Sequence, residues 1–157
     1  MHIARIKSEF CIANFMAMIR KTDAADYPCL MEIWESAVLH THDFLKKEDF
    51  LFYKKQMPAY FEQVTLLGYE ENDLLVAFMG VSGEHLEMLF VHHDFRGKGI
   101  GKKLVSYGME QLKVSRVDVN EQNIQALDFY KRIGFSVLQR VEFDGAGKAY
   151  PILKMGL

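Results

Sequence analysis

The segment from Arg96 to Gly101 combines glycines and basic side chains in a pattern that suits an anionic ligand. It reads Arg-Gly-Lys-Gly-Ile-Gly and stands between an expected strand and an expected helix. Glycines let the backbone turn tightly and let its N–H groups approach an anion closely. The start of the helix adds a positive dipole end, and Arg96, Lys98 and Lys102 add formal charge. We expect a phosphate or pyrophosphate site here, with an ordinary turn carrying solvated lysines as the alternative.

Two well-known phosphate-binding loops do not fit this segment. A Walker loop needs four positions between its first glycine and its Gly-Lys pair, and only three residues separate Gly97 from Gly101, so Gly97 is one residue too close. Lys103 also stands where that loop needs a hydroxyl. A dinucleotide fingerprint needs a small residue where Lys102 stands, and it needs a parallel βαβ unit at its start.

The residues that must position this turn form alternating elements along the chain. Strands are expected over 19–21, 64–70, 74–81, 85–91, 116–120, 135–141 and 150–155. Helices are expected after Thr22 and Asp23, over 46–63 with a kink or break at Pro58, over 100–113, and from the capping residue Asn123 to Ile133. An antiparallel half followed by a βαβ crossover predicts an α+β fold with a mixed central β-sheet flanked by helices.

Composition limits the classes of protein to which the chain can belong. With 157 residues, 50% of them hydrophobic and 25% charged, one globular domain is expected. The formal net charge of −2 gives no general attraction to nucleic acid. No apolar run approaches the length of about 20 residues that spans a bilayer, so no membrane partner is expected. We interpret residues 1–17 as an N-terminal extension of unknown structure and residues 18–157 as the domain.

Neither the cysteines nor the histidine clusters form a recognisable metal signature. Cys11 and Cys29 are interpreted as reduced thiols of a cytoplasmic protein. The clusters at 40–43 and 92–94 contain neighbouring His and Asp residues but lack a distant third ligand. No metal is therefore expected.

Two segments of the chain resemble the signatures of the GNAT superfamily of N-acetyltransferases. The first is Leu89-Phe90-Val91 followed by the 96–101 turn, which is similar to the acetyl-CoA motif of that superfamily. The second runs from Asn123 through Ala126, Phe129 and Tyr130 to Gly134-Phe135, and it resembles the family's Asn-x-x-Ala-x-x-Phe-Tyr-x-x-x-Gly-Phe segment. Finer features at 41–45, 82–85 and 148–151 look like the YjaB-like bacterial subgroup. The resemblance implies the GNAT, or acyl-CoA N-acyltransferase, fold.

The resemblance also implies roles for individual residues. Tyr130 would protonate the sulfur of CoA as the general acid. Backbone N–H groups of the strand at 85–91 would contact the pantetheine arm or the acetyl oxygen, since this strand splays from its neighbour in the family. The residues implied in acetyl-CoA binding are Leu89, Phe90, Val91, Arg96, Gly97, Lys98, Gly99, Ile100, Gly101, Lys102, Asn123 and Tyr130.

His85 and Glu87 lie two apart on one expected strand, so their side chains share a face. A histidine near neutral pKa, or a carboxylate whose pKa is raised by burial, suits the deprotonation of an amine. Family members place their general base at one of these two positions, and Glu87 is preferred here, with His85 assisting. A solvent-facing polar surface is the alternative interpretation. Weaker candidates for the acceptor site are His42, Asp43, Asn120 and Tyr150.

These observations predict an N-acetyltransferase that moves acetyl from acetyl-CoA to the primary amine of an unidentified acceptor by direct attack in a ternary complex. Acidic character near Glu87 and Asp43 favours a small cationic molecule as the acceptor. Two alternatives remain. One is a CoA-binding sensor without efficient catalysis, and the other is an interaction protein that associates through the N-terminal extension or a sheet edge, for instance as a homodimer.

Overall fold

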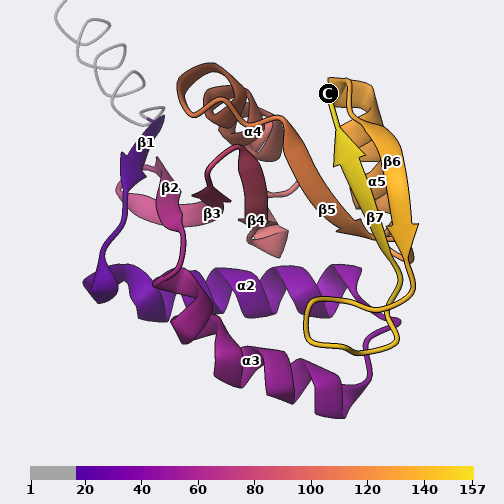
Figure 1. Cartoon of the computed structure of the whole chain (residues 1–157). Coiled ribbons are helices and arrows are strands. Elements are labelled where there is room, and N and C mark those ends of the chain that lie inside the picture. The colour runs from indigo at the N-terminus through magenta and orange to yellow at the C-terminus, as the bar shows by residue number, and fades with distance from the viewer. Residues whose placement is uncertain (1–16) are drawn as a thin grey trace, which may run out of the picture.

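The computed structural model describes residues 17–157, and it contains one mixed seven-stranded sheet with helices on both faces (Figure 1). The strands lie in the order β1-β2-β3-β4-β5-β7-β6. The strands are β1 (Ala17–Lys21), β2 (Thr65–Glu71), β3 (Leu74–Ser82), β4 (His85–Val91), β5 (Arg116–Asn120), β6 (Ser136–Val141) and β7 (Ile152–Gly156). The helices are η1 (Ala24–Asp26), α2 (Tyr27–Thr41), α3 (Lys47–Phe61), η2 (His93–Phe95), α4 (Ile100–Gln111) and α5 (Ile124–Ile133).

Successive side chains of β2 and β3 point to opposite faces of the sheet, so they pack into two separate hydrophobic cores. Leu66 and Phe78 face α2 and α3, whose contributions include Leu30, Ile33, Trp34 and Phe61. On the other face Leu67 and Met79 pack with Ile100, Leu104 and Val105 of α4. The sheet therefore separates one helical layer, α2 and α3, from another, α4 and α5 (Figure 1). These findings confirm the α+β prediction.

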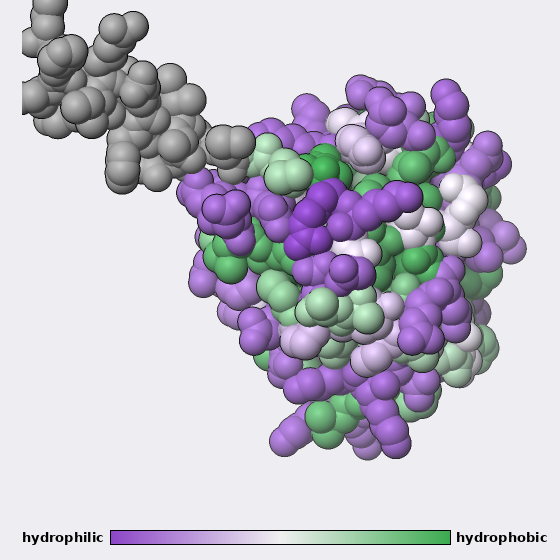
Figure 2. All heavy atoms as spheres, turned by 90° about the vertical axis from the view of Figure 1, so that its left-hand side faces the viewer, coloured by the Kyte–Doolittle hydropathy of each residue, from purple (hydrophilic) through white to green (hydrophobic). Residues whose placement is uncertain are grey.

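The β1 edge of the sheet carries charge. Arg20 donates to Glu70 on the neighbouring strand at 2.7 Å and to both carboxylate oxygens of Asp26 at 3.0 Å. Hydrophilic side chains predominate on the face of the molecule that bears this edge (Figure 2). Charged groups of this kind discourage another strand from pairing with the exposed edge.

Strands β4 and β5 form the single parallel pair among the described strands, and they part almost at once. Their ladder consists of His85 with Arg116 and Leu86 with Val117. Beyond these pairs β5 is bonded to β7 on its other side, so the second half of β4 faces a gap. A bulge adds to this local irregularity, because Val81 pairs with Leu86 and Gly80 with Met88, which leaves Glu87 as the extra residue.

Several boundaries differ from the sequence prediction. The expected break at Pro58 is wrong, because α3 continues through it. Pro58 is exposed, so the carbonyl that its missing N–H leaves unpaired can face water, while buried Met57 and Phe61 hold the helix against the core. The last strand begins at Ile152, not at Tyr150. Strand β1 begins at Ala17, and the extension expected before it lies outside the described residues. Within residues 17–157, no helix has both the length and the apolar character needed to cross a membrane.

Candidate active site

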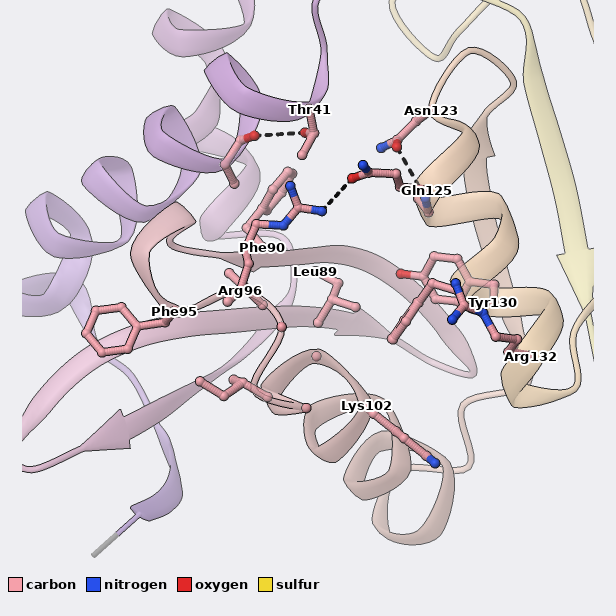
Figure 3. A pocket seen from close by; sticks show the side chains of 18 of the residues that line it. Thr41, Leu89, Phe90, Phe95, Arg96, Lys102, Asn123, Gln125, Tyr130 and Arg132 are labelled. Atoms are coloured by element: carbon pink, nitrogen blue, oxygen red, sulfur yellow. Dashed lines mark hydrogen bonds between the residues drawn. The ribbon is translucent and has the colours of Figure 1, made fainter. Parts of the chain in front are cut away.

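The gap between β4 and β5 opens into a cleft of about 440 Å³. Its walls come from the second half of β4, the glycine turn, the first turn of α4, one side of α5 and the end of α2 (Figure 3). The sequence motifs around the 96–101 turn and around Asn123 to Tyr130 thus meet across one space, although 21 residues separate them in the chain.

The glycine turn has the geometry of an anion cradle. Gly97 and Gly99 adopt left-handed φ angles of 76° and 78°, which glycine reaches without steric cost. Gly99 is the N-cap of α4, and its carbonyl accepts the N–H of Lys103. This is the first hydrogen bond of the helix, so the preceding N–H groups, those of Ile100, Gly101 and Lys102, have no acceptor within it. A Cβ placed at Gly97 or Gly99 would meet no atom within 4 Å, which shows that the turn is open to a ligand.

Strand β4 offers a second set of backbone donors to the cleft. The N–H of His92 donates to the carbonyl of Val76 on β3 at 2.8 Å. Successive N–H groups of a strand point to opposite sides, so that of Phe90 also faces β3, while those of Leu89 and Val91 face the edge from which β5 has departed. Both residues line the cleft. This arrangement supplies the donors that the family resemblance led us to expect.

Basic side chains surround the turn unequally. Arg96 lines the cleft and donates to the side-chain carbonyl of Gln125 on α5 at 2.7 Å, which links the two walls (Figure 3). Lys102 and Arg132 line the same cleft. Lys98 is not part of its lining, and its ammonium lies 4.9 Å from the centre of the Phe95 ring.

Tyr130 lies at the junction of the cleft and the hydrophobic core. Its ring packs edge-on against Phe129 and Phe135, at centroid distances of 5.0 Å and 5.7 Å. Its hydroxyl points from α5 toward Leu89 on β4 (Figure 3). Burial raises the pKa of Tyr130, so the phenol stays protonated at neutral pH. The arrangement presents a fixed proton donor to the cleft.

Two asparagines lie near the start of α5. Asn123 caps α5, as predicted, by accepting the N–H of Ala126 at 3.2 Å, and it lines the cleft. Asn120 ends β5, and its side chain accepts the N–H of Gln122 at 3.1 Å. Both residues also line a second, smaller cavity of about 120 Å³ between β4 and β5.

The smaller cavity has an acidic wall. Glu87 on β4 and Asp118 on β5 line it, and both carboxylates are about two-fifths exposed. His85 lies between them, with Nε2 3.2 Å from Asp118 Oδ1 and Nδ1 3.2 Å from Glu87 Oε1. The hydrogen bond to Asp118 raises the pKa of His85, and the charge of Glu87 acts in the same direction, while burial opposes both. The same bond lowers the pKa of Asp118.

Of the four predicted acceptor residues, His42 lines both cavities and Asn120 lines only the smaller one. The Nδ1 of His42 lies 2.7 Å from the Thr41 hydroxyl, and burial lowers the pKa of His42 to about 4 against a smaller opposing effect of Asp43. Asp43 itself is exposed and lines neither cavity.

Tyr150, another predicted acceptor residue, also lies outside the linings of both cavities. It donates to Asp49 of α3, whose other carboxylate oxygen pairs with Lys148 at 2.8 Å. The Tyr150 hydroxyl accepts the N–H of Lys46 at 3.1 Å. The structure therefore assigns Tyr150 to a contact between the 142–151 loop and the start of α3.

Sequence reasoning missed several residues that line the site. Asp118 alternates with buried Val117 and Val119, so its outward direction could be read from the strand, but its proximity to His85 depends on the parallel pairing of β4 with β5. Gln125 and Arg132 stand within the second motif without being part of its pattern. In the part of the chain that the structure describes, no group of three or more His, Cys, Asp or Glu residues is arranged to hold a metal ion.

Comparisons with known proteins point in one direction. Residues 38–151 match the family described as acetyltransferase (GNAT) domain. The chain is 37% identical over 141 residues to the peptidyl-lysine N-acetyltransferase YjaB of Salmonella typhimurium, covering 89% of this chain and 97% of that protein. The solution structure of apo YjaB from Escherichia coli superposes with a TM-score of 0.78 at 36% identity, covering 90% and 97% of the two chains. An N-acetyltransferase of Thermoplasma acidophilum, solved in complex with coenzyme A, shares the fold, with a TM-score of 0.70 at 20% identity over 90% and 99% of the chains.

Proposed function

The chain belongs to the GNAT family of acetyltransferases, and from that premise we propose that it transfers acetyl from acetyl-CoA to a primary alkylamine by direct attack in a ternary complex. One observation carries the proposal. The backbone donors of β4, the open glycine turn and the Tyr130 hydroxyl converge on one cleft, where β4 and β5 separate.

The donor side, which we define as the cavity lined by Leu89, Val91, the 96–101 turn and the start of α5, fits acetyl-CoA. The free N–H groups of the first turn of α4 suit a pyrophosphate, with Arg96 and Lys102 adding positive charge. The N–H groups of Leu89 and Val91 suit the amide carbonyls of the pantetheine arm or the developing oxyanion. When bound, acetyl-CoA would supply an activated thioester carbonyl.

Tyr130 is well suited to protonate the departing sulfur. Its hydroxyl faces Leu89, whose N–H points into the same gap, so acid and backbone donor can act on neighbouring atoms (Figure 3). Because burial raises the pKa of its phenol, the proton is present when the thiolate leaves.

The acceptor side, which we define as the smaller cavity with His42, Glu87 and Asp118, suits a cationic amine that must become neutral before it attacks. Two carboxylates attract an alkylammonium, and Glu87 can take its proton. His85 hydrogen-bonds to Asp118, and its Nδ1 lies 3.2 Å from Glu87 Oε1, so its charge would act on both carboxylates. Such an enzyme would work in the cytoplasm, with its cosubstrate.

The sequence prediction described the acceptor more narrowly than the relatives support. That prediction favoured a small molecule, whereas the relative from Salmonella is named a peptidyl-lysine N-acetyltransferase. A lysine side chain and a small polyamine share the primary alkylammonium group. The acceptor cavity of about 120 Å³ has room for the amine-bearing end of either one. We therefore propose a primary alkylammonium group as the acceptor, and the experiment below distinguishes a lysine side chain from a small polyamine.

Titration calorimetry with acetyl-CoA tests the donor side. Gly101→Glu is the informative variant, because a Cβ at Gly101 has only ordinary contacts of 3.6 Å or more and a carboxylate there would face the expected phosphates. Gly101→Ala controls for bulk, and Gly145→Glu controls for added charge at an open glycine outside the cleft. We expect saturable binding that Gly101→Glu abolishes and the controls retain. No binding by the wild-type protein would overturn the proposal.

Release of CoA, measured with two kinds of amine, then tests the acceptor side. Nα-acetyl-lysine amide and lysine-containing peptides represent the protein side chain, and spermidine represents the small cationic molecule. Turnover with the lysine probes alone would assign a peptidyl-lysine acceptor, and turnover with spermidine alone a small one. No turnover with any primary amine, despite binding of acetyl-CoA, would contradict the proposed transfer.

A further inference from the structure

His42 occupies the boundary between the donor and acceptor sides, because it is in the lining of both cavities. Its backbone is fixed in place at the end of α2. The N–H donates to the carbonyl of Val38 at 2.9 Å, and the carbonyl accepts the N–H of Leu45 at 3.0 Å. The imidazole also packs against Phe44, with 5.2 Å between the ring centroids. The ring is therefore positioned by its surroundings before any ligand arrives.

Hydrogen bonding with Thr41 determines which nitrogen of His42 carries the proton. The Thr41 hydroxyl lies 2.8 Å from the carbonyl oxygen of Ala37 (Figure 3). It also lies 2.7 Å from His42 Nδ1. A carbonyl can only accept, so the single hydroxyl proton is donated to Ala37. The contact with His42 then needs its hydrogen from Nδ1. The neutral imidazole is thus the Nδ1–H tautomer, and Nε2 carries a lone pair.

The lone pair on Nε2 is available to a ligand. Among the described residues no hydrogen bond to Nε2 is formed, and the imidazole borders the space that Glu87, Asp118 and Tyr130 also line. Burial keeps the pKa of His42 far below that of a free alkylamine, so the imidazole remains neutral and does not retain a proton from the substrate. Of the acidic groups facing it, Asp43 is exposed, and Glu87 and Asp118 lie across the smaller cavity.

We propose that His42, through Nε2, accepts a hydrogen bond from the N–H of the attacking amine and so directs the nitrogen lone pair at the acetyl carbon. The inference rests on the proposed function and adds a residue that orients the acceptor. The ammonium first gives one proton to Glu87, which passes it to solvent. The neutral nitrogen then forms the new bond to the acetyl carbon as the carbon–sulfur bond breaks, Glu87 takes the second proton that the nitrogen loses, and Tyr130 protonates the sulfur. Proton exchange with solvent then restores the Glu87 carboxylate and the Tyr130 phenol. His42 itself neither gains nor loses a proton, so it differs from the general base.

Three variants separate this role from a structural one. His42→Phe keeps a flat ring against Phe44 but has no acceptor, and His42→Gln restores an amide oxygen near the position of Nε2. Thr41→Val removes the group that selects the tautomer. His40→Phe is the matched control, because His40 lies two residues earlier, is exposed and lines neither cavity. Each is assayed for CoA release with Nα-acetyl-lysine amide and spermidine, and for its Kd for acetyl-CoA.

We expect His42→Phe to lower kcat/KM for the amine by about tenfold, the usual effect of losing one hydrogen bond at a reacting group, with the Kd for acetyl-CoA within about twofold. His42→Gln should recover most of the loss, and His40→Phe should match the wild type. Nitrogen NMR of the wild-type protein at neutral pH should show a protonated Nδ1 and an unprotonated Nε2 on His42, and Thr41→Val should change that ratio.

Several results would overturn the inference. One is a kcat/KM for His42→Phe within about twofold of wild type, and another is a loss in His42→Gln as large as that in His42→Phe. A protonated Nε2 in the wild-type protein would exclude the tautomer regardless of activity. A matching loss of acetyl-CoA affinity in His42→Phe would assign a structural role. Failure of the wild-type protein to bind acetyl-CoA would instead remove the proposed function, which the calorimetry reveals independently.

Discussion

The donor side and the acceptor side of the cleft are built from different parts of the polypeptide. The donor side presents backbone N–H groups from β4 and from the first turn of α4, and its conformation depends on glycines with left-handed φ angles. The acceptor side presents side chains, namely His42 from the end of α2, Glu87 from a bulge in β4 and Asp118 from β5. Backbone recognition requires particular residue types in a short segment, whereas side-chain recognition requires particular distances between segments.

Because of this difference, substitutions on the two sides should have different consequences. A substitution in the glycine turn changes main-chain geometry, which most side chains cannot reproduce. A substitution at His42 or Asp118 changes only one polar contact of a surface to which the end of α2, β4, β5 and α5 all contribute. The two sides should therefore respond separately to mutation, and Tyr130, which lines both cavities, should couple them.

Tyr130→Phe tests that coupling and should give the largest effect. Removal of the hydroxyl takes away the proton donor but keeps the packing on Phe129 and Phe135, so kcat should fall by roughly 10² or more. The Kd for acetyl-CoA and the KM for the amine should stay within about twofold, measured by calorimetry and steady-state kinetics. An unchanged kcat would show that Tyr130 is only a packing residue. A wild-type protein that binds acetyl-CoA without turnover would favour a sensor.

The acceptor side should also make stability depend on pH, because the pKa values of His42 and His85 are shifted in opposite directions. The folded pKa of His42 is about 4, below its ordinary 6.5, so its contribution is present above pH 6.5 and is lost as pH falls toward 4. That loss amounts to about 3 kcal/mol of unfolding free energy. The pKa of His85 is raised instead, so its contribution is present below its ordinary pKa and is lost as pH rises through the folded value.

Denaturant unfolding between pH 4 and pH 8 measures both contributions. His42→Phe should lose less stability than wild type on acidification, and Asp118→Asn should weaken the stabilisation that depends on protonated His85. The Asp118 effect should be below about 1 kcal/mol, because both partners are partly exposed to solvent. Parallel pH profiles for His42→Phe and wild type would contradict the assignment of His42 as a half-buried, neutral imidazole.

On the donor side, Arg96 and Lys98 provide a contrast between neighbouring cations. Arg96 lines the cleft, while the Lys98 ammonium lies over Phe95. Arg96→Ala should weaken acetyl-CoA binding by about tenfold and reduce its dependence on salt, since one charge near the phosphates is lost. Lys98→Ala should change the Kd by no more than about threefold. Equal effects of the two variants in calorimetry at low and high salt would show that general charge, and not the cleft geometry, determines affinity.

The smallest effect is expected at a distance from both cavities. Asp49 holds Tyr150 and Lys148 against α3, and the Tyr150 ring lies 6.2 Å from that of Phe44, which supports His42. Asp49→Asn should lower the Tm and raise the KM for the amine on the order of twofold, with the Kd for acetyl-CoA unchanged. A lower Tm with no change in this KM would confine the network to a structural role.

The parts of the molecule that short segments determine were predictable from sequence. The 96–101 turn, the Asn123 cap and the bounds of β4 depend on glycine conformation, a local side-chain acceptor and hydrophobic patterning. The passage of α3 through Pro58 was not predictable locally, because burial of Met57 and Phe61 outweighs the lost hydrogen bond. The His85–Asp118 bond and the bulge at Glu87 likewise depend on strand pairing and register. The tautomer of His42 needs the three-dimensional position of Thr41 and Ala37.

The early separation of β4 from β5 also has a mechanical consequence. Two ladder pairs join the antiparallel half of the sheet, β1 to β4, to the half formed by β5, β7 and β6. Such a seam is the weakest line across the sheet, so thermal opening should begin there and the amides of the two halves should exchange with solvent as separate cooperative units. A molecule that hydrogen-bonds to the β4 edge within the gap would stabilise the junction between the two halves of the sheet for as long as it stays bound.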